Sequence, residues 1–126
     1  MFALHDPPLR VAEEFAMLDC ISGGRLVGGF PVGTLMDDND AYGLTPATLR
    51  ERYHEAHDLI VKSRTNPEPF AFNGRYTKLR YVNPWPRPVQ KSIPRFGSIP
   101  RGGSVETWDW TLEHDYMYLL PVLLRL

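Results

Sequence analysis

Residues 8–33, PLRVAEEFAMLDCISGGRLVGGFPVG, predict a helix followed by a short strand. Asp6 is placed to cap the helix and Pro7 fits its first position, because proline needs no amide donor there. We expect the helix to end at Gly23, since glycine adopts the left-handed cap conformation at low cost. Apolar side chains recur along it at helical spacing, namely at Val11, Phe15 and Leu18. Residues 25–30 are mainly apolar and therefore predict a buried strand.

The rest of the chain continues this alternation of helices and strands. A second helix is expected from Thr45 to the residues before Asn66. Its inward stripe consists of Leu49, Tyr53, Ala56 and Ile60. Asn73-Gly74 then predicts the tight turn of a surface hairpin. A strand at residues 96–99 and a helix at residues 105–115 complete an order that predicts an α/β fold with a parallel sheet.

The composition argues against several classes of protein. The 126 residues carry 14 Lys and Arg against 15 Asp and Glu, a balance that disfavours sequence-independent nucleic-acid binding. The single cysteine cannot form an internal disulfide, and no apolar run approaches the ~20 residues of a membrane-spanning helix. The first ten residues do not resemble a signal peptide. We therefore expect a cytoplasmic chain that binds neither nucleic acid nor membrane.

The segment Gly102-Gly103-Ser104, which opens the last predicted helix, has the character of an anion-binding turn. Glycines let the backbone approach a bound group, and free amides at a helix start point towards it. The hydroxyls of Ser104 and Thr107 lie one turn apart. The segment therefore predicts a phosphate site, although it matches neither the dinucleotide-binding pattern nor the P-loop. The alternative is a glycine-rich turn in which Ser104 only caps the helix.

Gly29 and Gly33 form a second candidate site, at the carboxyl end of the first predicted strand. Ligands of parallel α/β folds gather at that end of the sheet, and glycines there leave room for a flat cofactor. The long connection at residues 31–44 fits a functional loop or a disordered one. The alternative is that the glycines serve a bulge or a close packing contact.

Weaker candidates have simpler explanations. His54 and His57 share the second predicted helix, but they lack the motif spacing and the third ligand of a metal site. Cys20 has no partner base in the sequence pattern, so a nucleophilic role is not expected. Trp108 and Trp110 are expected to pack against other apolar groups rather than to stack on bases, since no basic groove accompanies them.

Five segments, taken in order, resemble the luciferase-like flavin monooxygenases. Residues 12–25 contain the pattern AE-x-x-A-x-LD-x-x-S-x-GR of that family. It is followed by LRERYHEAHDLI at 49–60, FNGRY at 72–76, PRPVQ at 86–90 and GGSVETWDW at 102–110. The resemblance implies a (β/α)8 barrel that binds FMN or, in a sister branch, a deazaflavin. It also implies an oxidoreductase that uses reduced flavin and O2 on a small organic substrate, with a flavin reductase as partner.

Carried onto this chain, the resemblance implies that Ser104 and Thr107 bind the flavin phosphate, together with the backbone amides around Gly103. It also places Gly29 and Gly33 beside the cofactor, and residues 34–42 at the mouth of the active site. Some members carry an arginine at the position of Val32, so that cation is absent here.

A complete barrel of this kind takes about 250 residues. The resemblance therefore implies that residues 1–126 form a single partial barrel, a fragment with about three strand and helix units, and that residues 116–126 depart from the family pattern. Such a piece exposes sheet edges, so we expect it to be an incomplete enzyme. Two alternatives remain open, a deazaflavin-dependent oxidoreductase of the same superfamily and a non-catalytic α/β module that self-associates into a homo-oligomer.

Overall fold

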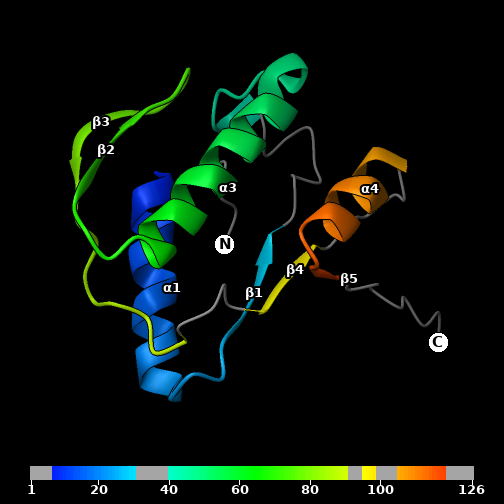
Figure 1. Cartoon of the computed structure of the whole chain (residues 1–126). Helices are drawn as coiled ribbons and strands as arrows, with labels where there is room; N and C mark the ends of the chain where they lie inside the picture. Colours follow the sequence, from blue (N-terminus) through cyan, green and yellow to red (C-terminus); the bar gives the residue numbers. More distant parts are fainter. Residues whose placement is uncertain (1–6, 31–39, 91–94, 99–104, 119–126) are drawn as a thin grey trace.

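The computed structural model describes residues 7–30, 40–90, 95–98 and 105–118. Figure 1 shows helices α1, α3 and α4 beside a small sheet, with a hairpin on the far side of α3. The core lies between the helices and the sheet; it contains Val11, Ala12, Phe15, Phe30, Tyr53, Ala56 and Ile60. Within the described ranges, no helix combines the length and the apolar character that a bilayer crossing needs.

Helix α1 spans Pro8–Ser22 and is capped by Pro7, so it begins one residue later than the Asp6 cap predicts. It ends as expected at Gly23, whose φ of 65° is left-handed and whose amide bonds to the Cys20 carbonyl at 3.1 Å. The helical spacing that groups Leu18 with Val11 and Phe15 predicts that all three face the core; this is wrong for Leu18, whose side chain is 44% exposed. The buried stripe passes instead through the neighbouring position, Asp19, which is 0% exposed.

Asp19 is tolerated in the interior because Gln90 supplies its hydrogen-bond partners. The Gln90 amide donates to Oδ2 at 2.9 Å, and its side-chain Nε2 donates to Oδ1 at 2.6 Å. Burial raises the pKa of the Asp19 carboxyl, but these hydrogen bonds and the charge of Arg64 outweigh it and hold the pKa below its usual value. Gln90 Nε2 also donates to the carbonyl of Leu26 at 2.9 Å. The single residue Gln90 thus connects the 83–90 segment both to α1 and to the residue that precedes β1.

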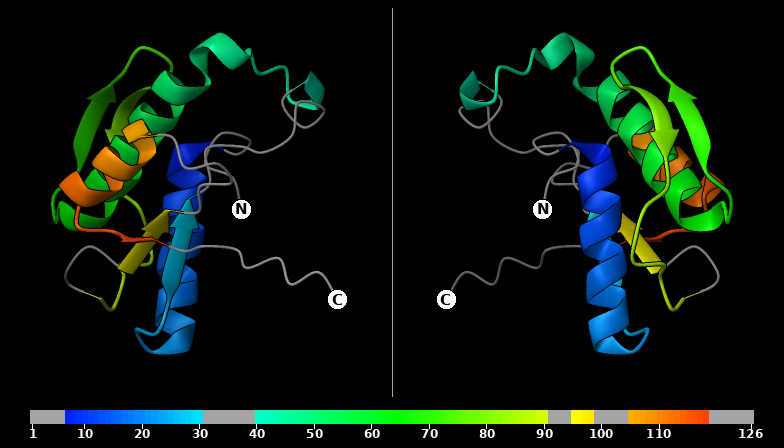
Figure 2. Two further views of the ribbon diagram at one scale, coloured as in Figure 1. Left: turned by 90° about the vertical axis from the view of Figure 1, so that its right-hand side faces the viewer. Right: turned by 90° about the vertical axis from the view of Figure 1, so that its left-hand side faces the viewer.

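The second predicted helix is confirmed, with an irregular start. A 3₁₀ turn at Pro46–Thr48 leads into α3, Leu49–Thr65, which ends at Asn66. Its buried residues are Tyr53, Ala56, His57, Leu59, Ile60 and Ser63. Helix α3 packs against α1, and both lie on one side of β1 (Figure 2).

The parallel sheet is also confirmed. It has the order β1-β4-β5, with β1 at Val27–Phe30, β4 at Arg95–Ser98 and β5 at Met117–Tyr118, and both pairings are parallel. Helix α4, Val105–Glu113, connects β4 to β5. Strand β5 thus falls inside residues 116–126, the segment predicted to depart from the family pattern, and residues 119–126 lie outside the described residues. The predicted α/β alternation therefore holds from α1 to β5.

The hairpin forms, but its predicted tight turn at Asn73-Gly74 is wrong. Strands β2, Phe70–Asn73, and β3, Lys78–Val82, are antiparallel and are joined by residues 74–77. The Glu55 carboxylate of α3 accepts hydrogen bonds from three successive amides of this turn, those of Arg75, Tyr76 and Thr77, at 2.6–3.1 Å. Because these amides point at one carboxylate, Arg75 and Tyr76 belong to the turn and not to a strand.

Candidate functional site

The parallel pairing of β1 with β4 brings the ends of the two strands to one edge of the sheet. Phe30, the last residue of β1, lies opposite Ser98, the last residue of β4. The segments that begin at residues 31 and 99 are therefore attached at the same edge, where ligands of parallel α/β folds bind. Of the residues predicted to bind a cofactor, Gly29 and Thr107 are described, and the others lie outside the described residues, namely Gly33, Gly102, Gly103 and Ser104.

Gly29 belongs to a row of residues that crosses all three strands. It lies opposite Gly97 of β4, which in turn lies opposite Met117 of β5. Side chains alternate between the faces of a strand, and Phe30 belongs to the core beneath the helices, so Gly29 faces the opposite side. Val27 and Met117 share that side and are 45% and 42% exposed. The paired glycines thus leave a flat area on a face that no described helix covers.

Helix α4 begins near the same edge, because a helix that connects two parallel strands must run back across the sheet. Its first turn contains Glu106, which forms an ion pair with Arg50 of α3 and so ties the start of α4 to that helix. Thr107 follows, and its carbonyl accepts a hydrogen bond from Thr111 Oγ1 at 2.7 Å. Thr107 therefore lies in the first turn of a helix whose amino end points to the candidate site.

The end of β1 is fixed from the helical side by Tyr53. Its hydroxyl donates a hydrogen bond to the Phe30 carbonyl at 3.0 Å, and the residue is only 2% exposed. Burial raises the pKa of the Tyr53 phenol, so the group remains a donor at neutral pH. The sequence pattern places Tyr53 inward but does not assign this contact. The one feature of the sequence that could have indicated the contact is a tyrosine on the inward stripe, because a buried phenol needs a hydrogen-bond partner.

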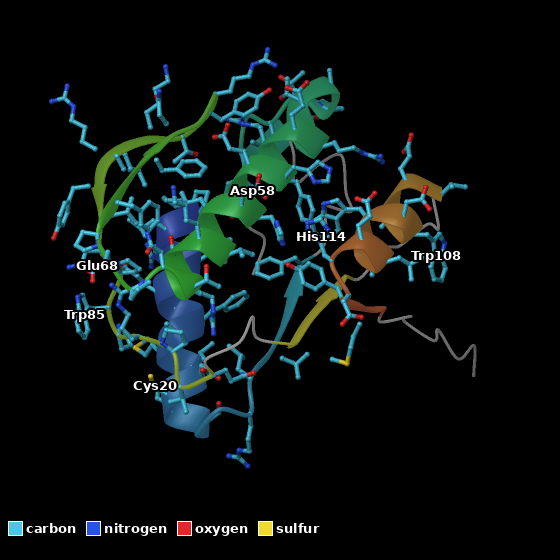
Figure 3. All side chains as sticks on the ribbon, in the orientation of Figure 1. Cys20, Asp58, Glu68, Trp85, Trp108 and His114 are labelled. Atoms are coloured by element: carbon cyan, nitrogen blue, oxygen red, sulfur yellow. The ribbon has the colours of Figure 1, made fainter. Side chains whose placement is uncertain are left out.

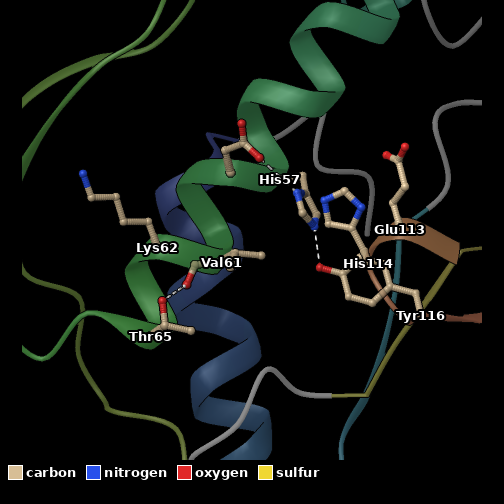
Figure 4. A pocket seen from close by; sticks show the side chains of 8 residues that line it. His57, Val61, Lys62, Thr65, Glu113, His114 and Tyr116 are labelled. Carbon is tan, nitrogen blue, oxygen red and sulfur yellow. Dashed lines mark hydrogen bonds and ion pairs between the residues drawn. The ribbon is translucent and has the colours of Figure 1, made fainter. Parts of the chain in front are cut away.

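A second group of polar and aromatic side chains lies between α3 and α4 (Figure 4). We call it the histidine–aromatic cluster; it consists of His54, His57, Trp110, His114 and Tyr116. His57 Nε2 lies 2.7 Å from the Tyr116 hydroxyl, and its Nδ1 lies 3.3 Å from Asp58 Oδ1. Burial lowers the pKa of His57, although Asp58 opposes the shift, and burial raises the pKa of Tyr116 to about 12. A neutral imidazole satisfies both contacts, with Nδ1–H donating to Asp58 and Nε2 accepting from Tyr116.

The cluster borders a pocket of about 520 Å³ that is also lined by Asp58, Lys62 and Glu113. The described residues hold no group of three or more His, Cys, Asp or Glu that is arranged to bind a metal ion. Trp110 and Tyr116 also pack against the core, on the helical side of the sheet. The sheet therefore separates this cluster from the Gly29–Gly97 face.

The structure also describes the surroundings of Cys20 and of the two tryptophans that sequence analysis considered. Cys20 Sγ lies 3.1 Å from the Arg87 carbonyl, which it contacts as a hydrogen-bond donor. The packing role predicted for both indoles is confirmed for Trp110, whereas Trp108 is 40% exposed. Figure 3 shows Trp108 on the side of α4 that faces away from α3. Sequence analysis did not single out Val27, Gly97 or Met117, which accompany Gly29 on the face away from the helices.

Comparison with known proteins finds one family that matches most of the chain. The sequence pattern described as luciferase-like monooxygenase matches residues 2–100. A curated relative, an F420-dependent glucose-6-phosphate dehydrogenase of Kineococcus radiotolerans, is 29% identical over 85 residues, which are 66% of this chain and 25% of the relative. The chain spans 25% to 36% of the length of several other curated relatives.

Two solved structures share the fold. Monooxygenase RslO1 from Streptomyces bottropensis has a TM-score of 0.86 at 24% identity, over 98% of this chain and 37% of that protein. The oxygenating constituent of 3,6-diketocamphane monooxygenase from Pseudomonas putida, in complex with FMN, has a TM-score of 0.77 at 19% identity, over 93% of this chain and 35% of that protein. Because the family pattern covers most of its length, the chain belongs to the luciferase-like monooxygenase family.

Proposed function

We propose that this chain forms part of a flavin-dependent monooxygenase that uses reduced FMN and O2 to oxidise a small organic substrate. The observation that carries the proposal is the register of β1 and β4, which attaches the two glycine-containing segments at one edge of the sheet. The monooxygenase solved in complex with FMN, which shares the fold, supports it. A flavin reductase is the partner that such an enzyme requires to supply the reduced cofactor.

In this proposal the sheet is part of a (β/α)8 barrel, and the face that carries Val27, Gly29 and Met117 is the barrel interior. The fit to a flavin rests on two features of the described residues. Gly29 and Gly97 present no side chains, so a flat ring can approach the backbone there. The amino end of α4 is favourable for a phosphate, because its dipole and free amides attract negative charge.

The residues of this chain bind and orient the cofactor. Ser104 and Thr107 would hold the phosphate through their hydroxyls, helped by the backbone amides around Gly103 and Ser104. Gly29 and Gly33 leave room for the ring, and Tyr53 keeps the end of β1 in place through the Phe30 carbonyl. When bound, the flavin supplies the redox chemistry.

A deazaflavin-dependent oxidoreductase is the second candidate, because a curated relative is named as an F420-dependent dehydrogenase. Such an enzyme transfers hydride and needs no oxygen. Direct comparison of FMN and a deazaflavin as ligands of the chain separates the two functions.

The test measures the binding of FMN and of riboflavin, which lacks the phosphate, by quenching of flavin fluorescence. We expect FMN to bind more tightly, and the double variant Ser104→Ala/Thr107→Ala to lower its affinity tenfold or more without changing that of riboflavin. Thr65→Ala is the control, since this exposed residue lies in the last turn of α3, at the end of the helix opposite Arg50, and its hydroxyl donates to the Val61 carbonyl at 2.9 Å. Equal affinity for FMN and riboflavin, or FMN binding that is unaffected by the double change, would contradict the proposed site.

A further inference from the structure

Arg64, near the end of α3, has a buried charge that the described residues do not satisfy. Its side chain is 2% exposed, and its nitrogens Nε, Nη1 and Nη2 have no hydrogen-bond partner among the described residues. The nearest opposite charge is Asp19, whose Oδ2 lies 3.8 Å from Nη2. Both oxygens of Asp19 already accept hydrogen bonds from Gln90. A guanidinium carries five N–H donors, so a buried one without partners is costly unless another group binds it.

A pocket of about 600 Å³ adjoins Arg64. Among the described residues that line it, none is acidic; those that matter here are Arg64, Asn66, Asn83, Trp85, Arg87 and Gln90. Because Gln90 also contacts Leu26, just before β1, the pocket lies towards the amino end of that strand. It is therefore distinct from the cofactor site proposed at the carboxyl edge.

The end of a helix normally repels anions, because its last carbonyls carry partial negative charge. Arg87 covers the carbonyls of the two residues that directly follow the helix. Its Nη1 donates to the Asn66 carbonyl at 2.8 Å, and its Nη2 donates to the Pro67 carbonyl at 3.1 Å and to Asn83 Oδ1 at 3.0 Å. The donors of Arg87 are thus engaged in shielding the helix end, whereas those of Arg64 have no such contacts among the described residues.

Trp85 gives the pocket an aromatic rim. It is 66% exposed, and Figure 3 shows it on the outer side of the 83–90 segment, away from the sheet. The Arg87 guanidinium lies 5.6 Å from the centre of its ring. A flat exposed ring that lines the same pocket as the buried cation of Arg64 suits a small organic anion better than a bare ion, because the ring can contact the organic part.

We propose that this pocket binds the carboxylate or phosphate group of a small molecule, with Arg64 as the residue that holds the oxyanion. Arginine is suited to this role because its planar donors match two oxygens of either group. The ligand offsets the buried charge that Asp19 leaves partly uncompensated. The site is independent of the flavin site, since it lies at the other end of β1 and uses none of the same residues.

The test uses the full chain with two probes, inorganic phosphate and benzoate, each compared with sodium chloride at equal ionic strength. Binding is measured by calorimetric titration and by the rise in the thermal midpoint. We expect at least one probe to bind, and the difference between them shows whether the natural ligand is a phosphate or a carboxylate. Failure of both probes to bind would overturn the proposal.

Variants separate this site from general charge effects and from the proposed phosphate site. Arg64→Met is expected to weaken binding of the probe tenfold or more. Arg80→Met, which removes an exposed charge from β3, is the matched control and is expected to bind as the parent chain does. Thr107→Ala removes a hydroxyl of the proposed flavin-phosphate site and so reports whether the probe binds there instead. Binding that survives Arg64→Met but is lost in Thr107→Ala would place the anion at the other site and overturn the proposal.

A measurement without a change at Arg64 covers the case in which that variant does not fold. The chain has three tryptophans, so their indole N–H resonances can be assigned by replacing each in turn. Titration of the probe is expected to shift the resonance of Trp85 and to leave those of Trp108 and Trp110 in place. A shift confined to Trp108 or Trp110 would contradict a site beside Arg64.

Discussion

The Tyr53 hydroxyl, on α3, donates a hydrogen bond to the main-chain oxygen of Phe30, the last residue of β1, at 3.0 Å. The contact joins the helical layer to the strand end at which the candidate site begins. Both residues are buried, with 2% of each exposed, so the carbonyl has no access to bulk water as a substitute partner. The position of the carboxyl edge thus depends on a side chain 23 residues away in the sequence.

Tyr53→Phe removes this hydrogen bond and keeps the ring. We expect the free energy of unfolding to fall by about 1–3 kcal/mol, because a buried carbonyl is left without its partner. Urea unfolding followed by far-UV circular dichroism measures the change. Tyr81→Phe is the control, since Tyr81 is 68% exposed and its loss is expected to cost under about 0.5 kcal/mol. Equal stability of Tyr53→Phe and the parent chain would show that the contact does not hold the strand.

Gly74→Ala tests the turn that Glu55 organises. A Cβ at this position would overlap the Glu55 carboxylate, which can move aside only by giving up its hydrogen bonds to the turn amides. We therefore expect a loss of about 1–3 kcal/mol in the free energy of unfolding. Glu55→Ala removes the obstructing group, and the same glycine change is expected to cost less in that background. Urea unfolding of the four chains gives the coupling between the two sites. Additive effects would mean that Glu55 does not constrain Gly74.

His57 gives the stability a defined pH dependence. Burial lowers its pKa below the ordinary value of 6.5, although Asp58 opposes this, so the unfolded chain takes up a proton first as the pH falls. Stability from this group is therefore present above pH 6.5 and is lost as the pH falls towards the pKa of the folded state. His57→Gln is expected to reduce the slope of the unfolding free energy between about pH 7 and 5.

His54 contributes to the same slope, because burial lowers its pKa too. The double variant His54→Gln/His57→Gln is therefore expected to show a smaller slope than either single change. Urea unfolding at closely spaced pH values measures it. An identical slope in the parent chain and in the double variant would assign the pH dependence to other groups.

The elements that sequence analysis predicted correctly are those with local signals. Gly23 ends α1 because the position is left-handed, a conformation that few other residues adopt. Asn66 ends α3 because a residue before proline favours extended backbone, which it has here. The parallel pairing of β1 with β4 follows from the alternation of helices and strands. The sequence therefore predicts where the candidate site lies, because the carboxyl ends of parallel strands meet at one edge of the sheet.

The predictions that were wrong depend on contacts between distant residues. Leu18 is exposed because Asp19 takes the next inward position, and Asp19 is stabilised there by Gln90, 71 residues further on, which donates two hydrogen bonds, and by the charge of Arg64. The hairpin turn is longer than Asn73-Gly74 suggests because Glu55, on another element, binds its amides. Such pairs leave no periodic pattern in the sequence.

Flavin binding tests the central claim most directly. The measurement is the thermal unfolding of the full chain, followed by far-UV circular dichroism, with and without excess FMN. A ligand that binds only the folded state stabilises it by about 2.7 kcal/mol at a hundredfold excess over its Kd. We predict a cooperative transition whose midpoint rises with FMN concentration. A midpoint that stays constant over the same range would contradict the assignment of a flavin site to the carboxyl edge of this sheet.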